Sequence, residues 1–157
     1  MHPFHSQQLT EDQNKSNRDF LKILRLDSEA CLPTRAHADD AGLDLYGLED
    51  VFLEPGQGKV ARTGVAIALP SGHVGLVADR SSLAKKGLKT AGGVIDAGYR
   101  GEIQIVFWNL SSGPIHLKKG DKIAQLLILP ILTPAVSEVQ SLDETSRGTG
   151  GFGSTGA

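Results

Sequence analysis

The sequence predicts an all-β fold, a β-barrel or β-sandwich with short strands. Apolar runs of strand length recur along the chain, glycine- or proline-containing pairs separate them, and no apolar pattern with a helical period of 3.6 residues is sustained. The separating pairs are Pro55-Gly56, Ser71-Gly72, Gly92-Gly93 and Gly113-Pro114. Short strands punctuated in this way are typical of barrels and sandwiches.

Each predicted strand is an apolar run. In chain order the runs are Leu21–Leu26, Val60–Pro70, His73–Ala78, Glu102–Asn109 and Ile123–Ile131. Glu102–Asn109 alternates at its start and then becomes continuously apolar, and the last run ends in a proline-containing stretch. Ser81–Lys86 is the one segment that we expect to form a helical turn.

Length and composition limit the possible functions. A chain of 157 residues fits one domain that needs no disulfide or structural metal. Cys31 is the only cysteine, which excludes an intrachain disulfide and favours a reducing, cytoplasmic compartment. The net charge of −2 gives no basic surface for a nucleic acid partner. No run approaches the roughly 20 apolar residues of a membrane span, and we expect no membrane partner.

Both chain ends differ in composition from the middle. We expect residues 1–19, which are polar, to be a disordered arm, residues 20–143 to be the folded domain, and residues 144–157 to be a flexible glycine-rich flap. Five of the ten residues from Arg147 to Gly156 are glycine, which predicts mobility. The same stretch carries a cation, an aromatic ring and three hydroxyls. These groups, with close backbone N–H donors, suit a nucleotide with phosphates.

Two segments hold polar residues beside predicted strands. In Ala41–Gly47, Asp44 lies between apolar residues, so it requires hydrogen bonds or the water shell of a metal, unless it faces solvent on an edge strand. In Asp79–Gly87, Arg80, Ser81 and Ser82 follow a strand and open the expected helical turn. They suit a phosphate cradle, and the alternative is an ordinary serine N-cap beside a surface arginine.

Two further segments carry single polar residues of interest. Gly92–Ile103 is predicted to form a β-hairpin whose tip offers backbone groups to a base edge, Asp96 as a general base and Tyr99 as a surface for a sugar. The alternative is a plain hairpin with a turn-favouring aspartate. In Lys118–Ile128, Gln125 interrupts an apolar strand and needs a partner, for which a backbone group is the simplest alternative.

Together these five segments, in this order, closely resemble the five motifs of the trimeric deoxyuridine triphosphatase (dUTPase) family. The strongest matches are A-G-L-D-L, R-S-S-L-A-x-K-G, G-V-I-D-A-G-Y-R-G, K-G-D-K-I-A-Q-L and R-G-T-G-G-F-G-S-T-G, and the resemblance spans roughly residues 43–156. It implies a homotrimer of jelly-roll β-barrels with active sites between subunits. It also implies hydrolysis of dUTP to dUMP and pyrophosphate with Mg²⁺.

The resemblance also implies a role for individual residues. Asp96 is expected to activate the attacking water, Tyr99 to pack on the deoxyribose, and Asp44 to contact Mg²⁺ through water. The remaining substrate contacts fall into three groups: phosphate binding by Arg80, Ser81, Ser82 and Gln125; uracil reading around Thr90, Gly93, Val94 and Ile95; and closure by a neighbouring subunit's flap through Arg147, Phe152, Gly153, Ser154 and Thr155. In that flap, Phe152 is expected to stack on uracil.

Two positions depart from the family pattern, and two other functions compete. Asp79 replaces a frequent proline, and Thr90 replaces an asparagine that helps to read uracil in some relatives. A dCTP deaminase of the same fold is expected to carry a catalytic glutamate before Phe107, where this chain has Val106. A catalytically silent nucleotide-binding module on the same fold is the second alternative, but it would need no general base at Asp96.

Overall fold

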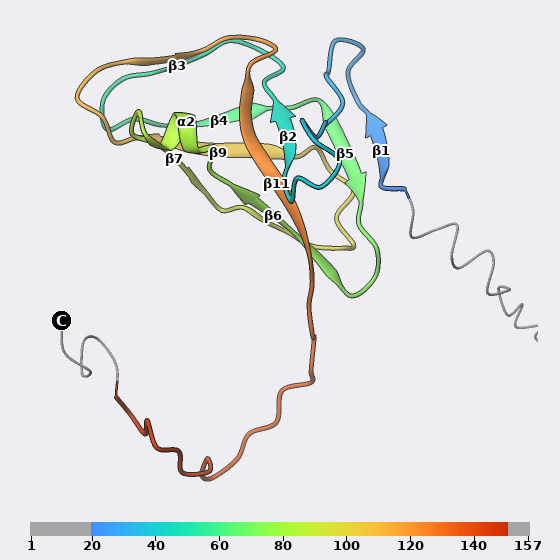
Figure 1. Cartoon of the computed structure of the whole chain (residues 1–157), viewed down its shortest axis with the longest axis vertical. Helices are drawn as coiled ribbons and strands as arrows, with labels where there is room; N and C mark the ends of the chain where they lie inside the picture. The colour runs from blue at the N-terminus through green and yellow to red at the C-terminus, as the bar shows by residue number, and fades with distance from the viewer. Residues whose placement is uncertain (1–19, 151–157) are drawn as a thin grey trace, which may run out of the picture.

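The computed structural model of the protein describes residues 20–150 and consists almost entirely of β-strands (Figure 1). The strands are β1 (Lys22–Arg25), β2 (Leu43–Tyr46), β3 (Val51–Leu53), β4 (Gly58–Arg62), β5 (Val65–Ala68), β6 (His73–Ala78), β7 (Leu88–Ala91), β8 (Val94–Ile95), β9 (Gln104–Asn109), β10 (Ile115–Leu117) and β11 (Lys122–Pro130). One turn of helix, α2 (Ser81–Ala84), lies between β6 and β7, where the sequence predicts it. The all-β prediction is confirmed. No helix in this part of the chain is long and apolar enough to cross a membrane.

The strands pair into four antiparallel sheets. A four-stranded sheet has the order β2-β11-β6-β8, a three-stranded sheet has the order β4-β9-β7, and β1-β5 and β10-β3 form two-stranded sheets. The hydrogen bonding does not close these sheets into a continuous barrel, in contrast to the barrel that the sequence analysis expects. The four-stranded sheet is the one that matters for function, because its strands carry or precede most of the predicted site residues.

One apolar core joins the sheets, because alternate residues of each strand point inward. In β2, Leu43 and Leu45 are buried while Asp44 and Tyr46 are only partly buried. The most deeply buried side chains of this core include Leu45, Leu53, Ile103, Ile105, Phe107, Ile123 and Leu126. The alternation leaves Asp44 on the opposite face of β2 from the core, and this places its carboxylate at the candidate site.

Asn109 is a buried polar residue at the end of β9, with its side chain fully inaccessible to solvent. Its Nδ2 donates to the carbonyl oxygens of Leu53 and Gly113 at 3.0 and 2.8 Å. Its Oδ1 accepts from the backbone N–H and the hydroxyl of Ser111 at 3.0 and 2.7 Å. These bonds tie the loop after β9 to β3.

We expect Asn109→Ala to lower the free energy of unfolding by about 3 kcal/mol, because it removes these bonds and leaves buried polar groups unpaired. Chemical denaturation measures the change, and Ser112→Ala, at an exposed neighbouring position, is the control. If both variants unfold at the same denaturant concentration as the unchanged protein, the Asn109 network adds no stability.

The predicted strand Val60–Pro70 is two strands in the structure. The chain breaks between β4 and β5 at Gly64, whose φ of +70° is a left-handed conformation that favours glycine. Before the break β4 pairs with β9, and after it β5 pairs with β1. The apolar pattern predicts the extended backbone correctly, but it does not show this change of sheet.

The predicted β-hairpin at Gly92–Ile103 is wrong. β8 pairs with β6, and β9 pairs with β4 and β7, so the two sides of the turn belong to different sheets. A tight turn connects them, in which the N–H of Tyr99 donates to the carbonyl of Asp96 at 3.0 Å. We call residues 96–99 the Asp96 turn. Two apolar runs around a turn signal do not reveal whether they pair with each other or with other strands.

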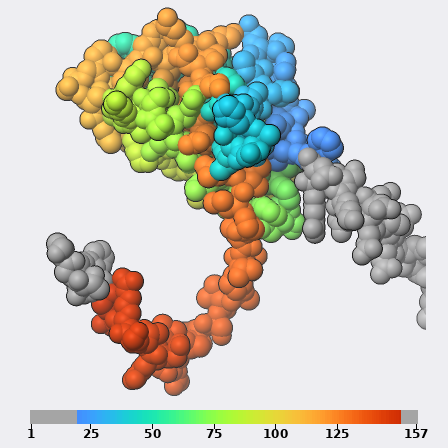
Figure 2. Space-filling view, viewed as in Figure 1, coloured from blue at the N-terminus to red at the C-terminus, as the bar shows by residue number. Residues whose placement is uncertain are grey.

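Beyond β11 the chain leaves the body of the protein (Figures 1 and 2). Residues 131–150 form no strand, and nearly all of them are exposed. Exposed apolar side chains in this segment are Ile131, Leu132, Val136, Val139 and Leu142. The predicted arm at residues 1–19 and the end of the predicted flap, residues 151–157, lie outside the described residues. The division at residues 143 and 144 remains a prediction.

Candidate functional site

A cluster of charged and polar side chains lies at one end of the four-stranded sheet. Asp44 of β2 lies beside Gln125 of β11, which lies beside Ala78 of β6, so the three residues form one row across three strands. Arg80 lies two residues after the end of β6, and its guanidinium turns back toward Asp44. We call Asp44, Arg80, Lys122 and Gln125 the Arg80 cluster.

Asp44 holds the two cations of this cluster. Its Oδ1 lies 3.5 Å from Nε of Arg80 and its Oδ2 lies 2.7 Å from Nζ of Lys122. β2 is an edge strand of its sheet, but the side chain of Asp44 is only 16% exposed, so it does not face solvent. Arg80 also donates to the carbonyl of Lys122 at 3.2 Å. The hydrogen bond with Asp44 raises the pKa of Lys122, which keeps its ammonium charged.

Gln125 is held at both ends of its amide. Its Nε2 donates to the carbonyl of Asp79 at 2.8 Å. Its Oε1 lies against Gly42, where any Cβ would collide with that oxygen. The glycine of the A-G-L-D-L segment therefore makes space for this side chain, and Gln125 takes the backbone partner that the sequence analysis considered.

Ser81 and Ser82 begin α2, and both are exposed. The N-cap residue is Arg80, which makes no side-chain capping bond, so the ordinary serine N-cap is not what the structure contains. The two hydroxyls follow directly after the guanidinium of the Arg80 cluster. Cation and hydroxyl donors in sequence form the kind of surface that binds phosphate oxygens.

Asp79 replaces the proline of the family pattern. Its negative charge is balanced by other side chains. Its Oδ1 accepts from the N–H and the hydroxyl of Thr90 at 2.7 and 2.6 Å, and its Oδ2 pairs with Lys89. Burial acts to raise the pKa of Asp79, but hydrogen bonds from Lys89 and Thr90 hold it below its ordinary value. Thr90 is thus occupied by Asp79, and its side chain points away from solvent.

The Asp96 turn presents a different surface. Asp96 and Tyr99 are exposed, and no side-chain or backbone donor within residues 20–150 bonds to the carboxylate of Asp96. The hydroxyl of Tyr99 donates to the carbonyl of Glu102 at 3.1 Å, which fixes the ring over the turn. An accessible carboxylate without protein partners can accept hydrogen bonds from water molecules.

Glu102 anchors the chain directly after this turn. It accepts from the N–H of Gly64 at 2.8 Å and from Nε of Arg62 at 3.1 and 3.2 Å. Burial acts to raise the pKa of Glu102, but the bonds from Gly64 and Arg62 hold it below its ordinary value of 4.5. The turn therefore rests on β4 and the start of β5.

The lowered pKa of Glu102 predicts a pH dependence of stability. A carboxyl with a lower pKa in the folded state stabilises the fold above its unfolded value, and that stabilisation is lost as the pH falls through the folded pKa. We expect the free energy of unfolding to fall between about pH 5 and about pH 3, and to fall less steeply in Glu102→Gln. Denaturation at several pH values measures this, and an equally steep fall of the unfolding free energy with pH in the two proteins would contradict it.

The described chain does not bring the whole predicted site together. Ile95 of β8 pairs with Gly75 near the start of β6, whereas Arg80 lies beyond Ala78 at the end of β6. Asp96 and Arg80 therefore lie toward opposite ends of β6, and Gly75 and Ala78 are about 10 Å apart along the strand. Arg147 lies on the exposed segment after β11, where its Nε donates to the carbonyl of Gly150 at 3.1 Å. Phe152, Gly153, Ser154 and Thr155 are outside the described residues.

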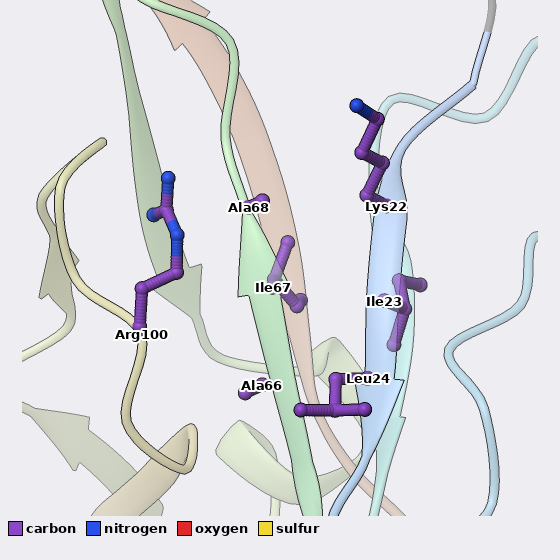
Figure 3. A pocket seen from close by; sticks show the side chains of 7 residues that line it. All are labelled: Lys22, Ile23, Leu24, Ala66, Ile67, Ala68 and Arg100. Atoms are coloured by element: carbon purple, nitrogen blue, oxygen red, sulfur yellow. The ribbon is translucent and has the colours of Figure 1, made fainter.

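A mainly apolar hollow lies elsewhere, on the sheet that β1 and β5 form (Figure 3). It is lined by Lys22, Ile23, Leu24, Ala66, Ile67, Ala68 and Arg100. Arg100 already donates to the carbonyls of Ala97 and Tyr99 at 2.7 and 2.8 Å. No residue of the Arg80 cluster lines this hollow, so it is not the candidate site.

Known proteins resemble this chain in sequence and in fold. A model of the dUTPase family matches residues 28–156. The deoxyuridine 5'-triphosphate nucleotidohydrolase of Corynebacterium jeikeium is 52% identical over 143 residues, which cover 87% of this chain and 92% of the relative. The protein belongs to the dUTPase family. Its fold agrees with solved dUTPase structures. Staphylococcus bacteriophage 80alpha dUTPase with dUPNHPP has a TM-score of 0.84 and 34% identity, covering 88% of this chain and 99% of that one.

A second solved dUTPase concerns a metal. A variant from phage phi11 of S. aureus has a TM-score of 0.74 and 33% identity, covering 78% of this chain and 98% of that one, and its structure is described as revealing the coordination of a structural Mg(II) ion. In residues 20–150 of the present dUTPase, no group of three or more histidine, cysteine, aspartate or glutamate side chains could hold a metal ion.

Sequence reasoning missed three residues of this dUTPase that shape the site. Lys122 holds the second oxygen of Asp44, Lys89 holds Asp79, and Glu102 supports the Asp96 turn. Lys122 lies in the matched K-G-D-K-I-A-Q-L segment, which is a signal that could have been used. A carboxylate at position 79 beside a phosphate site requires a cation, but the sequence does not show that the cation is Lys89. Glu102 lies in the Gly92–Ile103 segment, but its bonds to Arg62 and Gly64 join residues that only the fold brings together.

Proposed function

We propose that this protein is a dUTP diphosphatase that hydrolyses dUTP to dUMP and pyrophosphate. The observation that carries the proposal is the presence of two complementary surfaces within a dUTPase fold. The Arg80 cluster supplies positive charge and hydroxyl neighbours, and the Asp96 turn supplies an accessible carboxylate without protein donors. Such surfaces suit phosphoryl transfer, which requires positioning and charge neutralisation more than covalent help from the protein.

In the proposed reaction, Asp96 orients a water molecule and accepts its proton as the oxygen attacks the α-phosphorus. The bond from the α-phosphorus to the oxygen that bridges to the β-phosphorus breaks, and its electron pair leaves with pyrophosphate. Tyr99 packs on the deoxyribose, and its position is fixed by the bond to the carbonyl of Glu102. The backbone at Gly93, Val94 and Ile95 reads uracil. Thr90 has little part in this reading, because Asp79 engages both its N–H and its hydroxyl.

Arg80, Ser81, Ser82 and Gln125 bind the phosphates, and Arg147, Phe152, Gly153, Ser154 and Thr155 close over the substrate. Mg²⁺, when bound, neutralises triphosphate charge and polarises the phosphoryl oxygens. The donor set fits this ion if the substrate phosphates hold it and Asp44 contacts it through water. Asp44 already shares its oxygens with two cations, which leaves it suited to an outer contact more than to direct ligation.

The site is completed between subunits of a homotrimer. Within one chain Asp96 and Arg80 lie near opposite ends of β6, so a dUTP molecule that touches both is accommodated more simply between two chains. Exposed apolar side chains also need cover. Val60 and Trp108 lie on the outer face of the three-stranded sheet at 53% and 46% exposure, and five apolar side chains of residues 131–142 are exposed.

The rival activities are less well supported. In a dCTP deaminase a glutamate is expected at position 106. Val106 lies there on β9, paired with Val60 of β4 and Ala91 of β7, and its side chain neither donates nor accepts a proton. The accessible carboxylate of Asp96 has no role in a catalytically silent binding module.

An assay of dUTP, dCTP and dTTP with Mg²⁺, read as pyrophosphate and ammonia, tests the proposal. We expect pyrophosphate from dUTP alone. Release of ammonia from dCTP would assign the chain to the deaminases. Tight dUTP binding without turnover would identify a silent module. Either of these results would overturn the proposed activity.

A further inference from the structure

We propose that Asp79 is a positioning residue for the triphosphate half of the site and that Lys89 cancels its charge. The inference rests on the proposed function, because it concerns how the phosphate-binding side chains are held. A proline, which family members often carry at this position, has no side-chain acceptor. The side-chain contacts of Asp79 with Thr90 and Lys89 are therefore absent where a relative has proline.

The side chain of Asp79 joins two sheets. Asp79 follows β6 of the four-stranded sheet, and its Oδ1 accepts both donors of Thr90 in β7 at 2.7 and 2.6 Å. β7 is an edge strand of the three-stranded sheet. The carboxylate thus closes the loop of residues 79–90 at its two ends, and Arg80, Ser81 and Ser82 lie within that loop. A closed loop presents its phosphate-binding side chains in fewer conformations, which lowers the entropic cost of binding.

The main chain of Asp79 positions a second phosphate-binding residue. Its carbonyl accepts the amide of Gln125 at 2.8 Å, and Gly42 limits the other end of that amide. A shift of Asp79 therefore displaces Gln125 together with Arg80. One residue outside the substrate contacts sets the geometry of both.

The charge of Asp79 requires compensation. A carboxylate next to Arg80 would repel a triphosphate, but Lys89 pairs with Oδ2 of Asp79 at the outer side of β7. Asp44, Arg80 and Lys122 of the Arg80 cluster are paired with one another nearby, and the 79–90 loop also carries the exposed Lys85 and Lys86. With Lys89 in place the two carboxylates are outnumbered by cations, so the region remains attractive to phosphate.

The test compares Asp79→Ala, Asp79→Asn and Lys89→Gln, with Lys59→Gln on β4 as a control for the loss of one lysine charge. Steady-state kinetics give kcat and KM for dUTP. Calorimetry gives affinities for the non-hydrolysable analogue dUpNHpp and for dUMP, which lacks the outer phosphates. Melting temperatures show whether each variant folds.

We expect Asp79→Ala to weaken dUpNHpp binding about tenfold and to raise KM similarly, with dUMP affinity nearly unchanged. Asp79→Asn keeps an acceptor for Thr90 and recovers most of the loss. Lys89→Gln raises KM about threefold at low salt and less at high salt. That increase disappears when Asp79→Asn is added, and Lys59→Gln has no effect.

Equal losses for dUpNHpp and dUMP in Asp79→Ala would overturn the proposal, because they would show general structural support. Unchanged dUpNHpp binding in all variants would also overturn it. If the unmodified protein binds dUpNHpp but does not hydrolyse dUTP, the proposed function fails, while the binding comparison still decides the role of Asp79.

Discussion

Asp96→Asn is expected to lower kcat for dUTP by about a hundredfold to ten-thousandfold while affinity for dUpNHpp is kept. The amide has nearly the shape of the carboxylate, but it cannot accept a proton from the attacking water. No side-chain bond of Asp96 within the described residues contributes to the fold, so stability should not change. Stopped-flow kinetics and calorimetry measure the two quantities.

Two results would exclude Asp96 as the general base. One is a near-normal kcat in Asp96→Asn. The other is a loss of kcat that matches a loss of dUpNHpp affinity, since this would mean that the side chain binds substrate. Asp39→Asn is a suitable control, because Asp39 is an exposed aspartate outside the candidate site.

Deletion of residues 147–157 is expected to leave a folded protein whose kcat/KM for dUTP falls at least about a hundredfold. The deleted stretch contains the arginine, the phenyl ring and two of the hydroxyls that we assign to closure over the substrate. The described part of it is exposed, and Arg147 bonds only to Gly150 of the same stretch, so the core loses no support. Melting temperature and kinetics check both statements.

Arg147→Lys and Phe152→Leu separate the two contributions to closure. The lysine keeps the charge but loses the two-pronged geometry, and the leucine keeps bulk but loses the flat face. A deletion variant that melts at a much lower temperature would show that the segment is structural. Full activity after deletion would show that it does not close the site.

The sequence predicts the strands of this protein better than their partners. His73–Ala78 is β6 residue for residue, and the helical turn begins at Ser81 as expected. The apolar pattern records burial, but it does not record which strand lies alongside. For this reason the sequence predicts a hairpin around Asp96, whereas in the structure β8 pairs with β6, and β9 pairs with β4 and β7.

The candidate site shows the same contrast: the sequence identifies polar residues beside strands, but not the contacts that depend on strand pairing. The strand register brings together three polar residues that the sequence places in or beside strands, namely Asp44, Arg80 and Gln125. The roles of Lys89 and Glu102 depend on pairs 10 and 38–40 residues apart, which no local pattern contains. The positions of Asp96 and Arg80 toward opposite ends of β6 also follow only from the pairing of β8, and they support our proposal that two chains share the site.

Mixing two inactive variants tests the shared site most directly. Asp96→Asn and Arg80→Ala chains carrying different tags are refolded together, and the mixed assemblies are isolated through both tags and assayed for dUTP hydrolysis. If Asp96 and Arg80 of different subunits form one site, about a third of the sites in the isolated mixed trimers are intact, and activity returns. Mixed assemblies without activity would contradict the account, because they would place both residues in a site within one chain.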